Sequence, residues 1–214
     1  MKVDWGGLRR RDPISREFGF DRGTPIDRYY IGHFLRSHSA DIRGRVLEIG
    51  DDTYTRTFGS PSVATRDILH VSEFNPHATI IGDLARDETL PQDAFDCAII
   101  TQTLHLIFEP RRAVTNLHRS LKPGGVLLVS VPGITPISID EWKDSWYWSF
   151  TRQSIRRMFS EVFGAQAVDF SAYGNVFAAT CFLQGVAVED VDASELDVRD
   201  PCYELLLCVR AQKR

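Results

Sequence analysis

The feature that most constrains the fold of this chain is a set of seven short runs of branched aliphatic residues, most of them separated by stretches long enough to hold a helix. A connection between parallel strands needs about a dozen residues and is usually helical, so the spacing predicts parallel pairing. The composition of the runs indicates strands that are buried on both faces. The expected strands are 46–49, 68–71, 79–81, 97–100, 126–131, 168–173 and 204–209.

Three helices can be placed from their start and stop signals. The first begins after Pro110 and is expected to stop at 122–125 (KPGG). The second takes Thr151 as its N-cap and ends at Gly164, a residue suited to a left-handed cap. The third begins at 24–27 (TPID), where the threonine is expected to cap and the proline to take the first helical position.

Between the last two expected strands, an apolar stretch (176–188) is followed by a run of acidic residues. Such a charge run predicts a solvent-exposed connection. No repeat, low-complexity tract or linker is visible, so residues 1–214 are expected to form one α/β domain. Within it, residues 1–44 are expected to form an N-terminal helical cap segment.

Composition excludes several function classes. The chain has 25 Lys+Arg against 29 Asp+Glu, and its basic run 9–11 is short, so we expect no nucleic-acid partner. No apolar run approaches the ~20 residues of a membrane span, and residues 1–12 lack the apolar core of a signal peptide, which predicts a cytoplasmic protein without a membrane partner. The four cysteines show no paired spacing, which favours buried thiols over a metal site or a disulfide framework.

The residues that follow the first four expected strands predict a ligand site, because ligands bind open parallel sheets beyond the strands' carboxyl ends. Gly50 permits a tight turn after the first strand, and Glu73, after the second, could accept both hydroxyls of a ribose. Asp83 and 101–102 (TQ) follow the third and fourth strands. Together they describe an elongated, nucleoside-like ligand. A dinucleotide is the alternative, although the further glycines of its fingerprint are missing after Gly50.

Several stretches, in order, resemble motifs of the class I S-adenosylmethionine-dependent methyltransferases. Residues 46–50 (VLEIG) resemble the first motif and 82–84 (GDL) the adenine-side loop, while 90–91 (LP) with 94–96 (AFD) resemble the approach to the fourth strand. Residues 121–128 (LKPGGVLL) resemble the stretch before the fifth. The resemblance implies a Rossmann-like, seven-stranded, mostly parallel sheet with helices on both faces, its last strand antiparallel, and S-adenosylmethionine as the cofactor.

The resemblance also implies roles for individual residues. By position, Glu48 and Gly50 would border the methionine tail, Glu73 would bind ribose, Asp83 and Leu84 would contact adenine, and Thr101 with Gln102 would close the near side.

This chain departs from the family where further glycines are common, with Asp51, Asp52 and Tyr54 in their place. The two acids would attract the cofactor's ammonium and repel its carboxylate. Alternatively, one of them caps the next helix.

The methyl acceptor is expected beside His105 and the loop 132–150. His105 follows the fourth strand and is the candidate general base; the alternative is a histidine bonded within a packed helix start. The loop is long and rich in aromatic residues, among them Trp142 and Trp146, which predicts a lid or an acceptor wall. Alternatively, its rings cover the edge of the sheet.

The segment 18–30 is expected to cover the cofactor, as such a segment often does in related enzymes. Tyr29 would then contact the methionine tail and Tyr30 the acceptor, although helical spacing puts at least one of the two in the core.

The sequence therefore predicts an S-adenosylmethionine-dependent methyltransferase that methylates oxygen on a small sugar-containing or secondary-metabolite acceptor. Two alternatives remain open. One is an inactive methyltransferase fold that serves as a binding or scaffold protein, suggested by the altered glycine loop. The other is an enzyme that binds S-adenosylmethionine for non-methyl chemistry.

Overall fold

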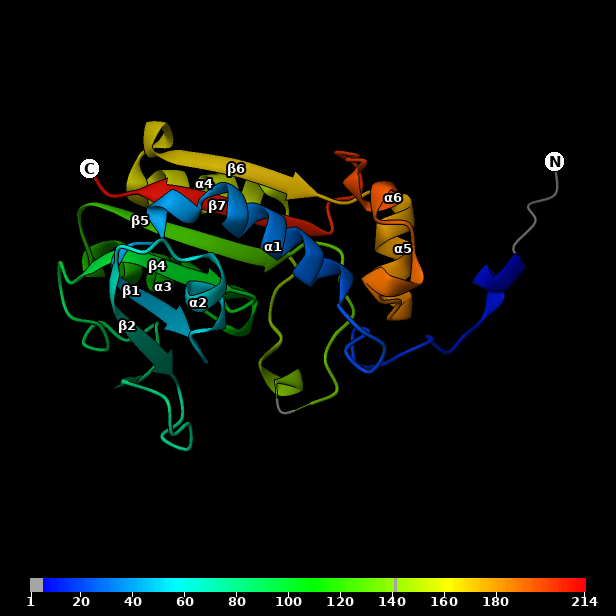
Figure 1. Ribbon diagram of the computed structural model, residues 1–214, viewed down its shortest axis with the longest axis horizontal. Helices are drawn as coiled ribbons and strands as arrows, with labels where there is room; N and C mark the ends of the chain where they lie inside the picture. Colours follow the sequence, from blue (N-terminus) through cyan, green and yellow to red (C-terminus); the bar gives the residue numbers. More distant parts are fainter. Residues whose placement is uncertain (1–5, 141) are drawn as a thin grey trace.

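The computed structural model describes residues 6–140 and 142–214, in which seven strands form one sheet in the order β3-β2-β1-β4-β5-β7-β6 (Figure 1). Neighbouring strands are parallel except β7, which is antiparallel to both β5 and β6. This confirms the predicted Rossmann-like class with an antiparallel last strand. The strands are β1 (Gly44–Ile49), β2 (Val63–His70), β3 (Ile80–Ile81), β4 (Phe95–Thr101), β5 (Leu121–Pro132), β6 (Val168–Tyr173) and β7 (Leu206–Gln212).

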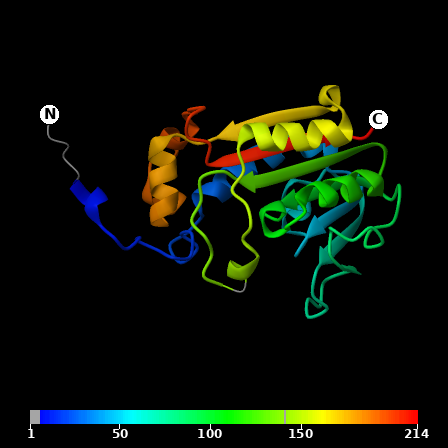
Figure 2. The same cartoon turned by 180° about the vertical axis from the view of Figure 1, so that it is seen from behind.

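Helices cover both faces of the sheet. α3 and α4 pack on one face around Leu117 and Phe159, whereas α1 and α5 pack on the other around Phe34 and Phe182 (Figures 1 and 2). The helices are α1 (Ile26–Ser37), α2 (Thr53–Phe58), α3 (Pro110–Ser120), α4 (Arg152–Phe163), α5 (Val176–Gln184) and α6 (Ala193–Asp197). Short 3-10 turns are η1 (Gly6–Arg9), η2 (Ser39–Asp41), η3 (Leu104–Leu106), η4 (Lys143–Ser145), η5 (Ala165–Ala167) and η6 (Val188–Asp190).

The aliphatic runs located every strand, but some ends differ from the prediction. β2 begins at Val63 rather than 68 because its first half is partly exposed and carries polar residues, so it lacks an aliphatic signal. β5 begins at Leu121 and includes the KPGG sequence that was expected to be a stop. An irregularity in the pairing with β4, between Phe95 and Cys97, accommodates the two glycines. Leu121 therefore belongs to the strand, and α3 ends at Ser120.

The predicted caps are right for α4 and wrong for α1. Thr151 accepts a hydrogen bond from the Ser154 backbone N–H, and Gly164 follows the helix with φ of 84°. At α1, the N-cap position is Pro25, and Thr24 makes no cap. Thr24 instead donates its backbone N–H and its hydroxyl to the Glu189 carboxylate, each at 2.7 Å.

Glu189 belongs to the acidic run that was expected to be a solvent-exposed connection. Glu189 and Asp190 are exposed, as expected, but they also bind the segment that precedes α1. Asp190 accepts two hydrogen bonds from Arg22, both 2.9 Å long. At its other end, the segment 14–24 is held by Gln184, whose carbonyl accepts from the backbone of Ile14 and Ser15. We call residues 14–24 the N-terminal strap. It lies beside the α5 end of the molecule, and residues 6–13 run outward from it (Figure 1).

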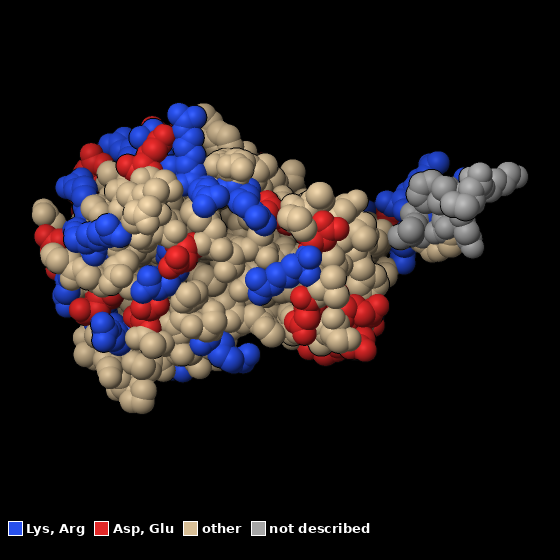
Figure 3. Space-filling model, turned by 90° about the horizontal axis from the view of Figure 1, so that it is seen from above, with Lys and Arg blue, Asp and Glu red and all other residues tan. Residues whose placement is uncertain are grey.

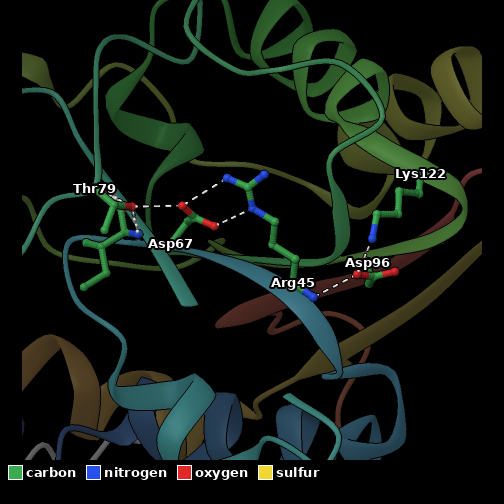
Figure 4. Close-up of polar contacts among 6 residues, drawn as sticks. Arg45, Asp67, Thr79, Asp96 and Lys122 are labelled. Atoms are coloured by element: carbon green, nitrogen blue, oxygen red, sulfur yellow. Dashed lines mark hydrogen bonds and ion pairs between the residues drawn. The ribbon is translucent and has the colours of Figure 1, made fainter. Parts of the chain in front are cut away.

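A polar cluster ties the strands together near the amino ends of β1, β4 and β5 (Figure 4). Arg45 donates two side-chain hydrogen bonds to Asp67, 2.7 and 3.2 Å long, and Thr79 donates to the same carboxylate. Asp96 accepts from the Arg45 backbone at 2.8 Å and from Lys122 at 2.7 Å. Because these links lie near the amino ends, the carboxyl edge of the sheet stays free for a site.

Burial and charge agree with a globular α/β protein. Cys97, Cys181 and Cys208 are buried, as predicted, whereas Cys202 is exposed. Among the described residues, no three His, Cys, Asp or Glu side chains are grouped as metal ligands would be. No helix in residues 6–140 or 142–214 is long and apolar enough to cross a membrane. In Figure 3, basic and acidic side chains are interspersed over the left part of the face, and acidic side chains gather at its lower right.

Candidate active site

A cavity of about 1260 Å³ opens where the strand order reverses, at the carboxyl ends of β1 and β4. A ligand pocket typically holds about 300–1,000 Å³, so this cavity has room for a cofactor together with an acceptor. The strand ends line one side of it. The N-terminal strap and the aromatic loop, residues 132–140 and 142–150, line the other. Residues 1–5 and 141, which fall in the predicted cap segment and loop, lie outside the described residues.

Most of the predicted site residues meet in this cavity. Those that line it are Glu48, Gly50, Asp51, Asp83, Leu84, Thr101, Gln102, His105, Trp142 and Trp146. They come from the ends of three strands, β1, β3 and β4, and from η3 and the aromatic loop, and the parallel topology brings the strand ends to one edge.

Three predicted site residues lie elsewhere. The Tyr30 ring is buried against Tyr173, and its hydroxyl donates to the Leu196 carbonyl, so it is a core residue and not an acceptor contact. Tyr29 donates its hydroxyl to Asp197 and does not line the cavity. Both corrections follow from the orientation of α1. The face of α1 that carries Tyr30 packs into the core, so residues on another face of the helix are directed toward the site.

Glu73 is exposed and does not line the cavity. β2 ends at His70, so Glu73 lies three positions beyond the strand, in a loop that leads away. His70 and Val71 line the cavity at the position expected for Glu73. The His70 ring faces the edge of Trp142 with 6.4 Å between centroids. Sequence reasoning missed His70 because the aliphatic run was taken to continue to Val71.

Asp27 and Arg28 of α1 are the other missed residues. Both line the cavity and form an ion pair, with 2.6 Å between Arg28 Nη1 and Asp27 Oδ2. Burial disfavours the Arg28 charge, but Asp27, Tyr54 and Asp51 outweigh that cost and raise the pKa of Arg28. The cavity therefore contains a fully charged guanidinium group. The altered glycine loop contributes only acidic charges, so this positive charge comes from α1.

Glu48 holds the start of α2. Its two carboxylate oxygens accept the backbone N–H groups of Tyr54 and Thr55, at 2.9 and 2.8 Å, and the Thr55 hydroxyl at 2.6 Å. Burial raises the pKa of Glu48 to about 7, against the hydrogen bonds from Thr55 and Tyr54 that lower it. Glu48 thus borders the cavity, but both of its carboxylate oxygens already accept hydrogen bonds from α2.

The two acids of the altered loop make different contacts. Asp52 occupies the N-cap position of α2 without a side-chain cap and pairs with Arg56 and Arg66, at 2.8 and 3.0 Å. Asp51 accepts the Thr53 backbone N–H and lines the cavity. Only one of the two acids, Asp51, therefore faces the cavity.

The cavity fits the methionine tail of S-adenosylmethionine. Gly50 has φ of 81°, and a Cβ at this position would meet no atom within 4 Å, so the backbone borders open space. Gln102 also has a positive φ, 45°, and donates its side-chain N–H to Asp27, while its Oε1 is buried with no partner among the described residues. Arg28 can pair with the carboxylate of the tail, and Gln102 Oε1 and Asp51 can accept from its ammonium.

Two more buried atoms without a partner in the described chain belong to residues of the cavity lining, His105 and Trp146. His105 is 2% exposed, and its ring centroid is 4.3 Å from that of Trp146. Neither His105 Nδ1 nor Trp146 Nε1 has a partner in the described residues. Burial, together with the Arg28 charge, lowers the pKa of His105 to about 3, so its imidazole is neutral at neutral pH. Phe18 of the strap also stacks on Trp146, with 6.0 Å between ring centroids.

Fold and cavity together define a Rossmann-like protein with a nucleoside-sized site at its switch point. The profile of the methyltransferase domain family matches residues 13–169, and the chain belongs to that family. It is a class I S-adenosylmethionine-dependent methyltransferase, and S-adenosylmethionine is its cofactor. No curated protein sequence matches the chain significantly.

Solved structures share the fold at low identity. An S-adenosylmethionine-dependent methyltransferase from Mesorhizobium loti is 19% identical, with a TM-score of 0.56 over 91% of this chain and 100% of that one. The N-methyltransferase NodS from Bradyrhizobium japonicum, in complex with S-adenosyl-L-homocysteine, is 15% identical, with a TM-score of 0.56 over 96% and 94%. The [4+2]-cyclase SpnF is 18% identical, with a TM-score of 0.55 over 90% and 83%.

Proposed function

We propose that this methyltransferase transfers the methyl group to a hydroxyl oxygen of a small acceptor. The observation that carries the proposal is the pair of buried, unpartnered atoms His105 Nδ1 and Trp146 Nε1. The indole N–H can only donate a hydrogen bond, and one nitrogen of a neutral imidazole can accept one. A hydroxyl group satisfies both, because it accepts from Trp146 while it donates to His105. A neutral amine, the form that can attack a methyl group, has a single lone pair, so it cannot accept from Trp146 while it attacks, whereas a hydroxyl oxygen has a second lone pair.

The low pKa of His105 defines its part in the reaction. A base of this strength cannot ionise an alcohol beforehand. The hydroxyl proton becomes acidic only as the oxygen forms its bond to the methyl carbon and the carbon–sulfur bond breaks. The proton then passes to His105 Nδ1, while Trp146 holds the oxygen in place. The larger part of the catalysis comes from alignment of the oxygen with the methyl group.

The other residues hold the cofactor in this proposal. Arg28, Gln102 and Asp51 bind its amino-acid tail, and Gly50 lets the chain approach closely. Asp83, which spends one oxygen on the Ala85 backbone N–H, keeps the other for the adenine amino group, beside Leu84. A sugar-containing or secondary-metabolite acceptor would supply the hydroxyl group, with Trp142 and Trp146 as its walls and the aromatic loop as a lid.

The first experiment is calorimetric titration with S-adenosylmethionine and S-adenosylhomocysteine, with Asp83→Ala as the comparison. We expect micromolar binding that Asp83→Ala weakens about tenfold, the loss of one good hydrogen bond. No binding at millimolar ligand would favour the scaffold alternative. Binding without any release of S-adenosylhomocysteine in acceptor screens would favour non-methyl chemistry.

The second experiment tests the attacked atom. Alcohols and phenols are assayed beside their amine counterparts for release of S-adenosylhomocysteine, and turnover is expected with the hydroxyl members. Trp146→Phe keeps the ring and the stack on Phe18 but removes the N–H, so it should lower kcat/KM about tenfold with unchanged cofactor affinity. Faster turnover of the amines, or an unchanged Trp146→Phe enzyme, would contradict oxygen transfer.

A further inference from the structure

Three aromatic side chains are exposed at the mouth of the cavity. Phe108, Tyr147 and Trp148 are 67%, 49% and 38% exposed. The Phe108 ring lies 5.4 Å from Tyr147 and 6.2 Å from Trp148, between centroids, so the three rings form one surface. We call it the aromatic ledge. Large apolar side chains exposed together in this way mark a binding surface more often than rings exposed singly.

The ledge is held in place by hydrogen bonds to the segment that carries His105. The backbone N–H groups of Tyr147 and Trp148 donate to the His105 carbonyl, at 3.0 and 3.2 Å. The Trp148 indole N–H donates to the Ile107 carbonyl at 3.0 Å. The backbone N–H groups of this segment and the Trp148 indole N–H thus already have hydrogen-bond partners within the protein. The faces of the rings remain available for an apolar contact.

The ledge is continuous with the proposed acceptor site. Phe108 and Tyr147 line the cavity from its rim, and Trp146, which directly precedes Tyr147, lies against His105 inside. Aromatic surface therefore runs from the unpartnered atoms of His105 and Trp146 out to Trp148. A molecule whose hydroxyl group reaches those atoms would lay the rest of its body on the ledge.

The charges around this path exclude one class of acceptor. Glu17, Glu109 and Asp140 line the cavity, and Glu17 has no ion-pair partner among the described residues. Of the two arginines in the lining, Arg28 pairs with Asp27 and Arg16 with Asp12, at 2.9 Å. With Arg28 assigned to the cofactor tail, the described lining leaves only the paired Arg16 against these three carboxylates, and this balance opposes phosphate and carboxylate groups on the acceptor.

We propose that the methyl acceptor is an uncharged molecule with a flat, apolar ring system, whose hydroxyl group binds beside the contacting rings of His105 and Trp146 and whose own rings lie on the aromatic ledge. The inference rests on the proposed oxygen transfer. Flat rings suit the surface because they can stack on or meet the edges of the exposed side chains. Phosphorylated sugars and nucleotides are excluded as acceptors, because the carboxylates of the lining would oppose them.

The experiment measures binding to the protein saturated with S-adenosylhomocysteine. Calorimetric titration uses 2-naphthol as the flat uncharged alcohol, 2-naphthyl phosphate as its charged counterpart, and glucose as a hydroxylated molecule without an apolar face. We expect 2-naphthol to bind with a Kd below about 1 mM, at least about tenfold tighter than either of the others. Equal or tighter binding of 2-naphthyl phosphate or glucose would overturn the inference.

A matched pair of variants assigns the binding to the ledge. Phe108→Ser should weaken 2-naphthol about tenfold, whereas Phe74→Ser, at a ring that is 90% exposed and outside the cavity lining, should leave it unchanged. Because both rings are exposed, neither variant should alter the melting temperature. Equal effects of the two variants would remove the ledge from the acceptor site.

Two further readouts separate the possible failures. S-adenosylhomocysteine must bind first, so failure of S-adenosylhomocysteine to bind would overturn the proposed function. Binding of S-adenosylhomocysteine without binding of 2-naphthol would overturn only the proposed class of acceptor. Size-exclusion chromatography of the wild type and Phe108→Ser tests whether another protein chain covers the ledge. A dimer that Phe108→Ser converts to monomer, together with no 2-naphthol binding, would assign the surface to self-association instead.

Discussion

Glu48 gives the sharpest test of the electrostatics at the cofactor site. The side chain is 2% exposed and anchors the first turn of α2 through three hydrogen bonds. Its pKa of about 7 lies above the ordinary value of 4.5 because burial disfavours the carboxylate. Glu48→Gln keeps the shape of the side chain and removes the titration, so comparison with the wild type isolates the proton.

The sign and size of the effect follow from the two pKa values. The unfolded chain releases the Glu48 proton near pH 4.5, but the folded protein keeps it until about pH 7. Between these values the folded state binds more protons, so the free energy of unfolding falls as pH rises. The contribution is fully present below pH 4.5 and lost above about pH 7. The pKa difference corresponds to about 3 kcal/mol.

The assay is urea denaturation of the wild type and Glu48→Gln from acid to slightly alkaline pH. The stability of the wild type relative to the variant should decline by about 3 kcal/mol across this range, with unchanged m values. The variant amide turns an N–H₂ toward Tyr54 or Thr55, which adds an offset of about 1–3 kcal/mol that does not vary with pH. The test is therefore the slope, against pH, of the difference in unfolding free energy between the wild type and Glu48→Gln, and not the constant offset.

The control for this experiment is Glu161→Gln. Glu161 is exposed, and its hydrogen bond from Arg157 lowers its pKa, so its difference curve should slope in the opposite direction. A flat curve for Glu48 would mean that its pKa is ordinary. A curve that rises with pH would mean that the N–H donors of α2 outweigh burial, and either result would refute the reasoning.

Three further substitutions test other parts of the structure. Gly50→Ala forces a methyl group into the open cavity at a φ of 81°, and should cost about 1–2 kcal/mol in urea denaturation and at least about tenfold in S-adenosylmethionine affinity; unchanged affinity would place the cofactor elsewhere. Arg28→Met should weaken S-adenosylmethionine about tenfold in calorimetry but not 5′-methylthioadenosine, which lacks the amino-acid tail; equal losses would contradict the pairing. Asp67→Ala breaks the hydrogen bonds from Arg45 and Thr79 and should cost about 1–3 kcal/mol, with cofactor affinity unchanged as the check that the damage stays local.

The fold was predictable because strands that are buried on both faces, such as β1 and β4, consist of consecutive aliphatic residues. This signal is missing where a strand is partly exposed or where a helix is apolar all round. The first half of β2 is partly exposed and carries no such run, and α5 is apolar over most of its surface, so the stretch 176–188 shows no helical periodicity. The acidic run after α5 is exposed, as predicted, but its contacts with the N-terminal strap were missed, because an exposed carboxylate that binds another segment looks the same in sequence as one that only meets water.

The site was predictable where topology alone places a residue. Gly50, Asp83 and Gln102 follow strands, and parallel strands bring their carboxyl ends to one edge. Placement on α1 required more, because the rotation of that helix decides whether Arg28 or Tyr30 faces the cavity. That rotation is set by packing against α5 and β7, which periodicity in a short segment does not reveal.

The altered glycine loop is the feature that most favoured a loss of function in the sequence, and the structure accounts for it by charge. Asp52 is directed to Arg56 and Arg66, outside the cavity, so it neither narrows the cofactor space nor repels a carboxylate there. Asp51 remains in the cavity, but Arg28 lies in the same lining and is influenced by its charge. An acid and a base placed there match the two charges of an amino-acid tail, which a loop of glycines would meet through its backbone alone. The substitution therefore changes how the tail is bound and does not by itself indicate that binding is lost.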